Sequence, residues 1–233
     1  MSRVTLSASA ALVLLLAACG GSSSGDGPSL DDQIENEIED KDGVLDGQII
    51  TTPDGTRYVV DAIDPNAPGV SSGYLLVARL DSRGNPVVIE TATAIGDAYN
   101  RNGATGTFEY SGNNVSYLSA DGAGFQRFEG DSSLSLDFDD NDDNGRLRST
   151  FQTGDGDATA VLDAPLDFNP ATGRFASDGG TLRYTDDDGP RTSSWGVAGG
   201  VNGANAGFSA THGSETGATA LIGRGVMAGE RNN

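Results

Sequence analysis

Apolar and polar residues alternate with a period of two through most of the chain after Gly47. In segment 133–138, for example, Leu134, Leu136 and Phe138 fall on one face of an extended strand and polar residues fall on the other. Turn-forming Gly, Asn, Asp and Pro separate such segments, and no segment after residue 42 shows sustained helical periodicity. We therefore expect strands at 48–52, 56–60, 74–80, 87–94, 106–110, 115–118, 133–138, 146–151, 161–168, 181–184, 193–197, 206–211 and 218–227.

Glycine favours a barrel over a sandwich for these antiparallel strands. The chain has 34 glycines among 233 residues, and several lie inside the expected strands. Glycine weakens a flat strand but allows the coiling and bending that a closed barrel needs. Closure also removes exposed strand edges. The sequence therefore predicts an all-β fold with a Gly-rich antiparallel barrel; the glycines inside strands include Gly196, Gly207, Gly223 and Gly225.

The N-terminal residues have the pattern of a secretory signal. Arg3 precedes an apolar stretch that is too short to span a bilayer and that ends in Leu-Ala-Ala-Cys at Cys19. This ending resembles a bacterial lipobox, whose cysteine receives a diacylglycerol thioether and acyl chains such as palmitate. Cys19 is the only cysteine of the chain; the alternative is an ordinary signal with an incidental cysteine. We predict a lipoprotein signal peptide over 1–18 and membrane attachment through the lipid on Cys19.

Gly20 and Gly21 follow the cysteine, where an Asp would be the alternative. This choice resembles lipoproteins that Gram-negative bacteria send to the outer membrane. We therefore expect a lipid-anchored protein of the outer membrane, on its periplasmic or its cell-surface face.

Residues 19–46 are predicted to form the lipidated cysteine and a flexible acidic tether. A Gly/Ser spacer opens this segment, and acidic residues dominate the rest of it. Ser29 could cap a short helix that places Leu30, Ile34 and Ile38 on one face. Short isolated helices are marginal in water, so we favour the solvated tether.

The charge balance restricts the partners. The chain carries 14 Lys and Arg against 34 Asp and Glu, a formal net charge of -20 at pH 7. Nucleic-acid binding needs clustered cations that neutralise phosphates, and docking on an anionic membrane surface needs them too. We therefore expect no nucleic-acid partner and no attraction to anionic headgroups.

Several motifs lie between about residues 104 and 231. They are Gly-x-Phe-x-Tyr-x-Gly at 106–112, an aliphatic strand that ends in Asp-Phe at 134–138, Gly-x-Phe at 173–175, and a Gly-rich closing segment that includes 199–200, 207–208 and 223–231. Together they resemble the eight-stranded barrel of the transferrin-binding protein B family of surface lipoproteins. The resemblance implies one barrel lobe at 104–233, a preceding β-hairpin extension at 47–103, and a protein ligand of the transferrin type.

Two features depart from that family. Trp195-Gly196-Val197 stands where the family has an aromatic-Gly-Pro step. The chain is also about half as long as a two-lobed receptor, so it holds at most one barrel. These departures put the ligand in doubt more than the fold.

Catalytic chemistry has little support in the sequence. His212 is the only histidine, and it lies in a polar segment that also contains Ser214 and Glu215. A catalytic base must be oriented by a third group in space, which adjacency in a turn does not supply. We expect His212 to be a solvent-exposed loop residue, the protein not to be an enzyme, and no cofactor to be required.

Calcium is the one metal that the sequence suggests. Asp140, Asp142 and Asn144 match the first half of an EF-hand loop, but Phe151 stands where the bidentate Glu should be, and two arginines replace ligands. The alternative is a hairpin turn rich in turn-forming residues, which we favour. The turn is therefore only a weak calcium candidate.

We predict a lipid-anchored binding protein of the cell envelope, a surface receptor-like module for a protein ligand. A lipocalin-like binder of a small molecule and a structural envelope lipoprotein are the alternatives. A ligand-sized cavity inside the barrel would favour the small-molecule binder, and a filled core with apolar loop tips would favour the protein binder. The aromatic residues that could lie in loops are Tyr99, Tyr117, Phe125, Phe128 and Trp195, although such residues more often belong to the core.

Overall fold

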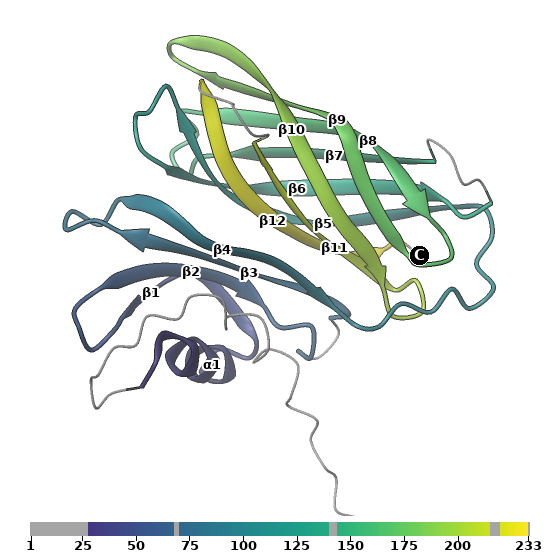
Figure 1. Ribbon diagram of the computed structural model, residues 1–233, viewed down its shortest axis with the longest axis horizontal. Helices are drawn as coiled ribbons and strands as arrows, with labels where there is room; N and C mark the ends of the chain where they lie inside the picture. Colours follow the sequence, from purple (N-terminus) through teal and green to yellow (C-terminus); the bar gives the residue numbers. More distant parts are fainter. Residues whose placement is uncertain (1–27, 68–69, 140–143, 215–219, 233) are drawn as a thin grey trace, which may run out of the picture.

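The computed structural model describes residues 28–67, 70–139, 144–214 and 220–232. Antiparallel strands make up most of these residues, with one helix near the N-terminus (Figure 1). In chain order the elements are α1 (Leu30–Asp40), β1 (Val44–Thr51), β2 (Arg57–Ile63), β3 (Ser72–Leu80), β4 (Pro86–Gly96), β5 (Thr107–Ala120), β6 (Gln126–Asp137), β7 (Gly145–Gln152), β8 (Thr159–Asn169), β9 (Arg174–Asp186), β10 (Gly189–Asn202), β11 (Gly207–Ser214) and β12 (Leu221–Arg231).

Strands β5 to β12 close into an eight-stranded barrel, as predicted. The spatial order is β10-β11-β12-β5-β6-β7-β8-β9, and each neighbouring pair is antiparallel. Exposed and buried residues alternate strictly along β7 and β8, so their apolar side chains fill the interior. Closure leaves the barrel with no free edge.

The sequence predicts separate strands at 106–110 and 115–118 with a turn at Gly112 and Asn113, but this turn is wrong because β5 runs through it without a break. A Cβ on Gly112 would lie 2.1 Å from the carbonyl oxygen of Ala228 on the neighbouring strand. Gly112 is therefore needed for the close approach of two backbones and not for a turn.

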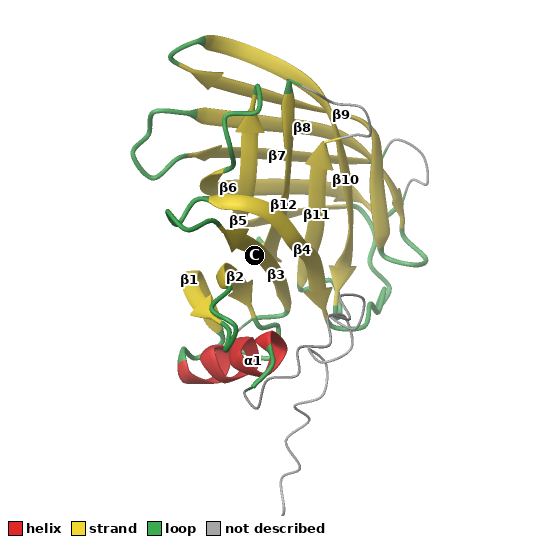
Figure 2. Cartoon of the chain, turned by 60° about the vertical axis from the view of Figure 1, so that its left-hand side comes forward, coloured by secondary structure: helices red, strands yellow, loops and turns green. Residues whose placement is uncertain are grey.

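The remaining four strands form a separate sheet in the order β1-β2-β3-β4. The strands expected at 48–60 and 74–94 form the two hairpins of this N-terminal extension, and the hairpins join through the pairing of β2 with β3. One face of this sheet packs on the outside of the barrel, where Leu76 and Ala78 meet Val115 and Val226. The molecule thus has three layers: helix, sheet and barrel (Figure 2).

Helix α1 covers the opposite face of the sheet. The predicted flexible tether is therefore wrong for residues 30–46, since Ile34 and Ile38 are buried in a core with Leu45 and Val60. Ser29 caps the helix by accepting a hydrogen bond from the Asp32 backbone, while the Asp32 carboxylate accepts one from the Ser29 backbone. Packing against the sheet supplies the stability that an isolated helix of this length lacks.

Candidate functional site

Side chains from all eight strands fill the barrel interior. Trp195, Phe128 and Phe208 are fully buried there, and edge-to-face contacts join Phe128 to Phe151 and Tyr184. Such packing leaves the interior occupied by the protein itself. A filled interior argues against the ligand cavity that the lipocalin-like alternative requires.

A chain of hydrogen bonds crosses this interior and includes His212. The Trp195 indole N–H donates to Nδ1 of His212 at 2.9 Å, so the ring proton lies on Nε2. Nε2 then lies 3.1 Å from Oγ of Ser116, and that hydroxyl donates to the side-chain oxygen of Asn114 at 2.6 Å. Asn114 in turn donates to Ser149 at 3.1 Å. His212, Ser116, Asn114 and Ser149 therefore each have a hydrogen-bond partner inside the barrel.

The prediction of a solvent-exposed loop histidine is wrong. His212 lies on β11 and is only 4 % exposed. Burial lowers the pKa of the imidazole to about 3, so the ring is neutral at physiological pH. Ser116 is within reach of the ring, but its hydroxyl proton points to Asn114 and no solvent reaches it. This geometry supplies structural hydrogen bonds and does not present a nucleophile to a substrate.

The linker between sheet and barrel crosses one end of the barrel. Arg101 donates to the Phe138 carbonyl at 3.0 Å, and its own carbonyl accepts from Asn205 at 2.8 Å. The Tyr99 hydroxyl donates to the Pro170 carbonyl at 2.7 Å. Ala104 is buried as part of the barrel core. This end is therefore occupied by the chain itself.

A buried carboxylate joins the sheet to the barrel. Asp61 of β2 is 0 % exposed and accepts hydrogen bonds from the Arg127 guanidinium at 2.7 Å and the Tyr117 hydroxyl at 3.0 Å. Arg127 also pairs with Glu129 and Asp46. Burial opposes the charge of Arg127, but the hydrogen bonds and charges of these three carboxylates raise its pKa further above its usual value. We call this group the Asp61 joint.

A pocket of about 500 Å³ opens beside the Asp61 joint, and we call it the tip pocket. It lies where the turns of the sheet meet the barrel end opposite the linker. Apolar and aromatic side chains form one part of its lining, polar residues such as Asn85 and Asp155 form the other part, and Arg127 lies among them. The lining includes Ile49, Val59, Leu80, Pro86, Tyr117, Phe125 and Arg127.

Two side chains of the tip pocket are available to a partner. Ile49 is 49 % exposed, and Phe125 is half-buried in the turn between β5 and β6. An exposed isoleucine beside an aromatic ring is apolar area that a partner could remove from water.

A smaller hollow of about 160 Å³ continues from the tip pocket, and we call it the acidic hollow. Gln126, Thr153 and Asp155 belong to both. The Arg191 hydrogen bond holds the pKa of Asp186 below its usual range, so this carboxylate is ionised at neutral pH. The acidic residues that line the hollow are Asp155, Asp157, Asp186, Asp187 and Asp188.

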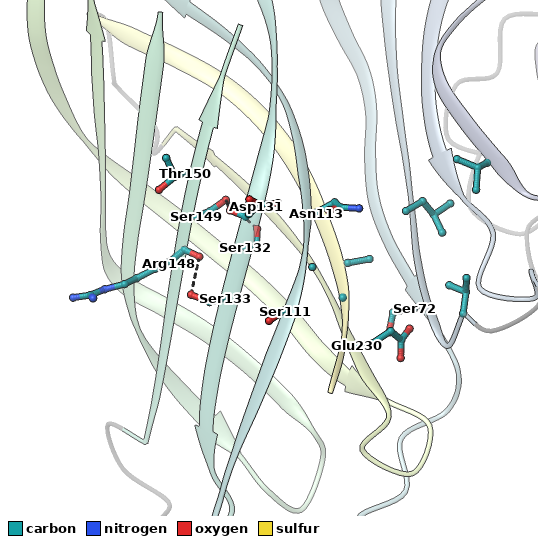
Figure 3. Close-up of a pocket in the computed structure, with 16 residues that line it drawn as sticks. Ser72, Ser111, Asn113, Asp131, Ser132, Ser133, Arg148, Ser149, Thr150 and Glu230 are labelled. Carbon is teal, nitrogen blue, oxygen red and sulfur yellow. Dashed lines mark hydrogen bonds between the residues drawn. The ribbon is translucent and has the colours of Figure 1, made fainter. Parts of the chain in front are cut away.

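A larger groove of about 960 Å³ lies between the sheet and the outer face of β5, β6 and β7 (Figure 3). The side chains on its barrel side are small, polar and exposed, as at Asn113, Asp131 and Thr150. Its apolar residues, such as Val44 and Ile63, lie on the sheet side. The groove is therefore polar on its barrel side and apolar on its sheet side.

Most of the aromatic loop candidates belong to the core. Tyr117, Phe128 and Trp195 lie within strands and are fully buried, and Tyr99 belongs to the linker. Phe125 lies in the turn between β5 and β6 and lines the tip pocket. Period-two alternation on β5, β6 and β10 could have separated these cases.

Of the three calcium-candidate residues, the structure describes Asn144. Asp140 and Asp142 lie outside the described residues, as does Cys19. Asn144 is buried, and its amide donates to the Asp137 and Phe168 carbonyls and accepts from the Phe168 N–H. Its oxygen thus holds β7 to β8. Across the described ranges no cluster of three or more His, Cys, Asp or Glu has the arrangement of a metal site, and no helix is long and apolar enough to cross a membrane.

No model of a known protein family matches the sequence, and no curated protein matches it either. The structure is similar to intact Ap-TbpB with its N and C lobes, at 12% identity and a TM-score of 0.48 over 81% of this chain. It is similar to a double mutant of transferrin-binding protein B from Haemophilus parasuis, at 13% identity and a TM-score of 0.49 over 80% of this chain. The chain spans 38% of the length of each of these two proteins.

A protein described as a surface lipoprotein is similar over 88% of both chains, at 12% identity and a TM-score of 0.45. Two of these three structures are of transferrin-binding protein B, whose family the sequence motifs resemble.

Proposed function

We propose that the protein is a lipid-anchored envelope protein that binds a protein partner at the tip pocket. The observation that carries the proposal is the group of apolar and aromatic side chains in the tip pocket, next to the acidic hollow and at the barrel end opposite the linker. Interfaces depend on a few apolar or aromatic anchors in desolvated pockets, and here Ile49 and Phe125 provide such a site. The lipobox at Cys19 supplies the anchor, and the outer membrane is the proposed location.

The partner has an apolar side chain that enters the tip pocket and basic residues that face the acidic hollow. A net charge of -20 attracts a basic surface and raises the rate of association at low salt. Affinity for such a partner falls as salt rises, because charges further apart than about 10 Å are screened at 0.1 M.

Binding to iron-loaded transferrin is the first test, since the motif resemblance implies a ligand of that type. The full chain, purified in detergent, is titrated at low and high salt, with haem as the rival small molecule. Phe125→Ala and Ile49→Ala each weaken protein binding by about tenfold or more, as truncation of an anchor residue does.

Val161→Ala is the matched control for these variants. Val161 is an apolar residue of β8 that is 43 % exposed and lies outside the tip pocket, so its truncation leaves binding unchanged. Saturable binding of haem without a protein partner contradicts the proposal in favour of a small-molecule binder. Binding of neither probe favours the structural role.

A further inference from the structure

The outer edge of β4 is free. Within the described residues β4 pairs only with β3, so one side of its backbone has unused hydrogen-bonding groups. From Thr91 to Gly96 its register against β3 is regular. The strand has 11 residues, of which Glu90 alone is charged.

The opposite edge of the same sheet is protected against pairing. β1 is shorter, carries Asp46, and has a register shift next to Gly47, whose φ is 61°. A charge and a bulge are common ways to block an exposed edge. β4 has neither from Thr91 onward, so this edge can accept a further strand.

A groove of about 790 Å³ runs along this part of β4, and we call it the edge groove. Ala92 and Ala94 line it on the sheet side. The outer face of β9, β10 and β11 forms its floor with small residues: Ala176, Ala198, Gly200 and Thr211.

The edge groove lies where an additional strand beside β4 would lie. Packed sheets lie about 10 Å apart, so a strand added beside β4 would lie one layer above the barrel wall. Because most of the floor residues are alanine, glycine and threonine, with Arg174 at one end of the groove, side chains of the added strand have room between the two layers. The free backbone edge and the space beside it therefore both favour an additional strand next to β4.

Charge identifies the occupant. Asp97 and Asp167 line the edge groove, Arg174 is the one cation among the described residues that line it, and the chain carries a net charge of -20. A second copy would bring the same charge and be repelled, whereas a basic segment would be attracted. We propose that an extended, basic segment of a protein partner binds in the edge groove and pairs with β4 as an additional strand.

The test uses two synthetic ten-residue peptides in which Val and Thr alternate with Lys or with Glu. The lysine peptide binds the full chain in detergent at least tenfold more tightly than the glutamate peptide. It also slows amide hydrogen exchange at Thr91–Gly96, because pairing protects the free side of the strand.

Ala198→Trp and Ala176→Trp fill the floor of the edge groove from two different strands, and each weakens binding at least tenfold. Val161→Trp is the control, since it places the same side chain on the outer face of the barrel away from the groove. Circular dichroism checks the fold of all three variants.

Four results of the peptide experiments would overturn the proposal. They are no binding of the lysine peptide, equal binding of both peptides, binding without protection of Thr91–Gly96, and binding that both groove-filling variants leave unchanged. Protection that instead appears with rising protein concentration and no peptide identifies a second copy as the occupant, which also overturns it.

Discussion

At the scale of single residues, His212 shows how a polar side chain is accommodated in a small barrel core. Its ring has a partner on each nitrogen, Trp195 on one side and Ser116 on the other. A Cβ on Gly225 would lie 2.4 Å from the ring, so the glycine of the facing strand makes room for it. Satisfied polar chains of this kind favour one arrangement of the core over others.

His212→Gln is predicted to change the pH dependence of stability. The folded state holds the pKa of His212 at about 3, whereas the unfolded state has the ordinary value of 6.5. Below pH 6.5 the unfolded chain therefore binds a proton that the folded protein does not, and stability falls as pH falls. One such proton changes stability by about 1.4 kcal/mol per pH unit. The stability advantage of wild type over the variant shrinks by about 2–3 kcal/mol between pH 7 and pH 4.5.

Urea unfolding of both proteins at several pH values measures this difference. The carboxylates are common to both proteins, so their titration cancels in the comparison. Parallel stability curves for the two proteins would show that the histidine is protonated in the folded state and is not buried as described.

The residues next to His212 explain why the sequence predicted an exposed loop position. The residues around it are of turn-forming type, but β11 extends through them to Ser214. Alternation was the better signal, since Phe208, Ala210 and His212 are two residues apart and all face the interior. Trp195 and Tyr117 fall inside the expected strands 193–197 and 115–118, so the same rule could have assigned them to the core and not to loops.

At the scale of elements, α1 is a structural part of the protein. Its sequence contained the information, a capping box and two isoleucines four residues apart. Propensity alone could not decide between helix and tether, because the sheet that stabilises α1 is assembled from strands up to β4. The barrel was predictable from alternation and glycine content, but the joining of two hairpins into one sheet depends on long-range pairing that local patterns do not contain.

Ile34→Ala is predicted to lower the free energy of unfolding by about 2–5 kcal/mol, the usual cost of emptying a buried aliphatic site. Ile34 is 1% exposed and packs in the core between α1 and the sheet. Asn36→Ala, on the exposed face of the same helix, changes stability by less than about 0.5 kcal/mol. Denaturant titration of the full chain measures the stability of both variants. Equal stability of Ile34→Ala and wild type would show that this segment is a flexible tether, as the sequence predicted.

At the scale of the whole molecule, the sheet and the barrel meet through a mixed interface. Apolar residues such as Leu76 and Val226 fill its centre, the Asp61 joint lies at the tip end, and Glu230 accepts two hydrogen bonds from Ser71 at the other end. The tip pocket exists only while both layers are held together, because its walls come from each of them. The tip pocket could not be predicted from sequence, since Ile49 and Phe125 are far apart in the chain and neither lies in a motif.

Arg127→Met tests whether the Asp61 joint holds the two layers together. The variant leaves the Asp61 carboxylate buried without its cation, which costs about 3–5 kcal/mol of stability. The double variant Asp61→Asn/Arg127→Met removes the buried charge as well and recovers part of that loss. Hydrogen exchange in Arg127→Met becomes faster in β1 to β4 than in β5 to β12, because the sheet can separate while the barrel stays closed. Exchange that accelerates equally in both layers would show instead that the joint stabilises the molecule as one cooperative unit.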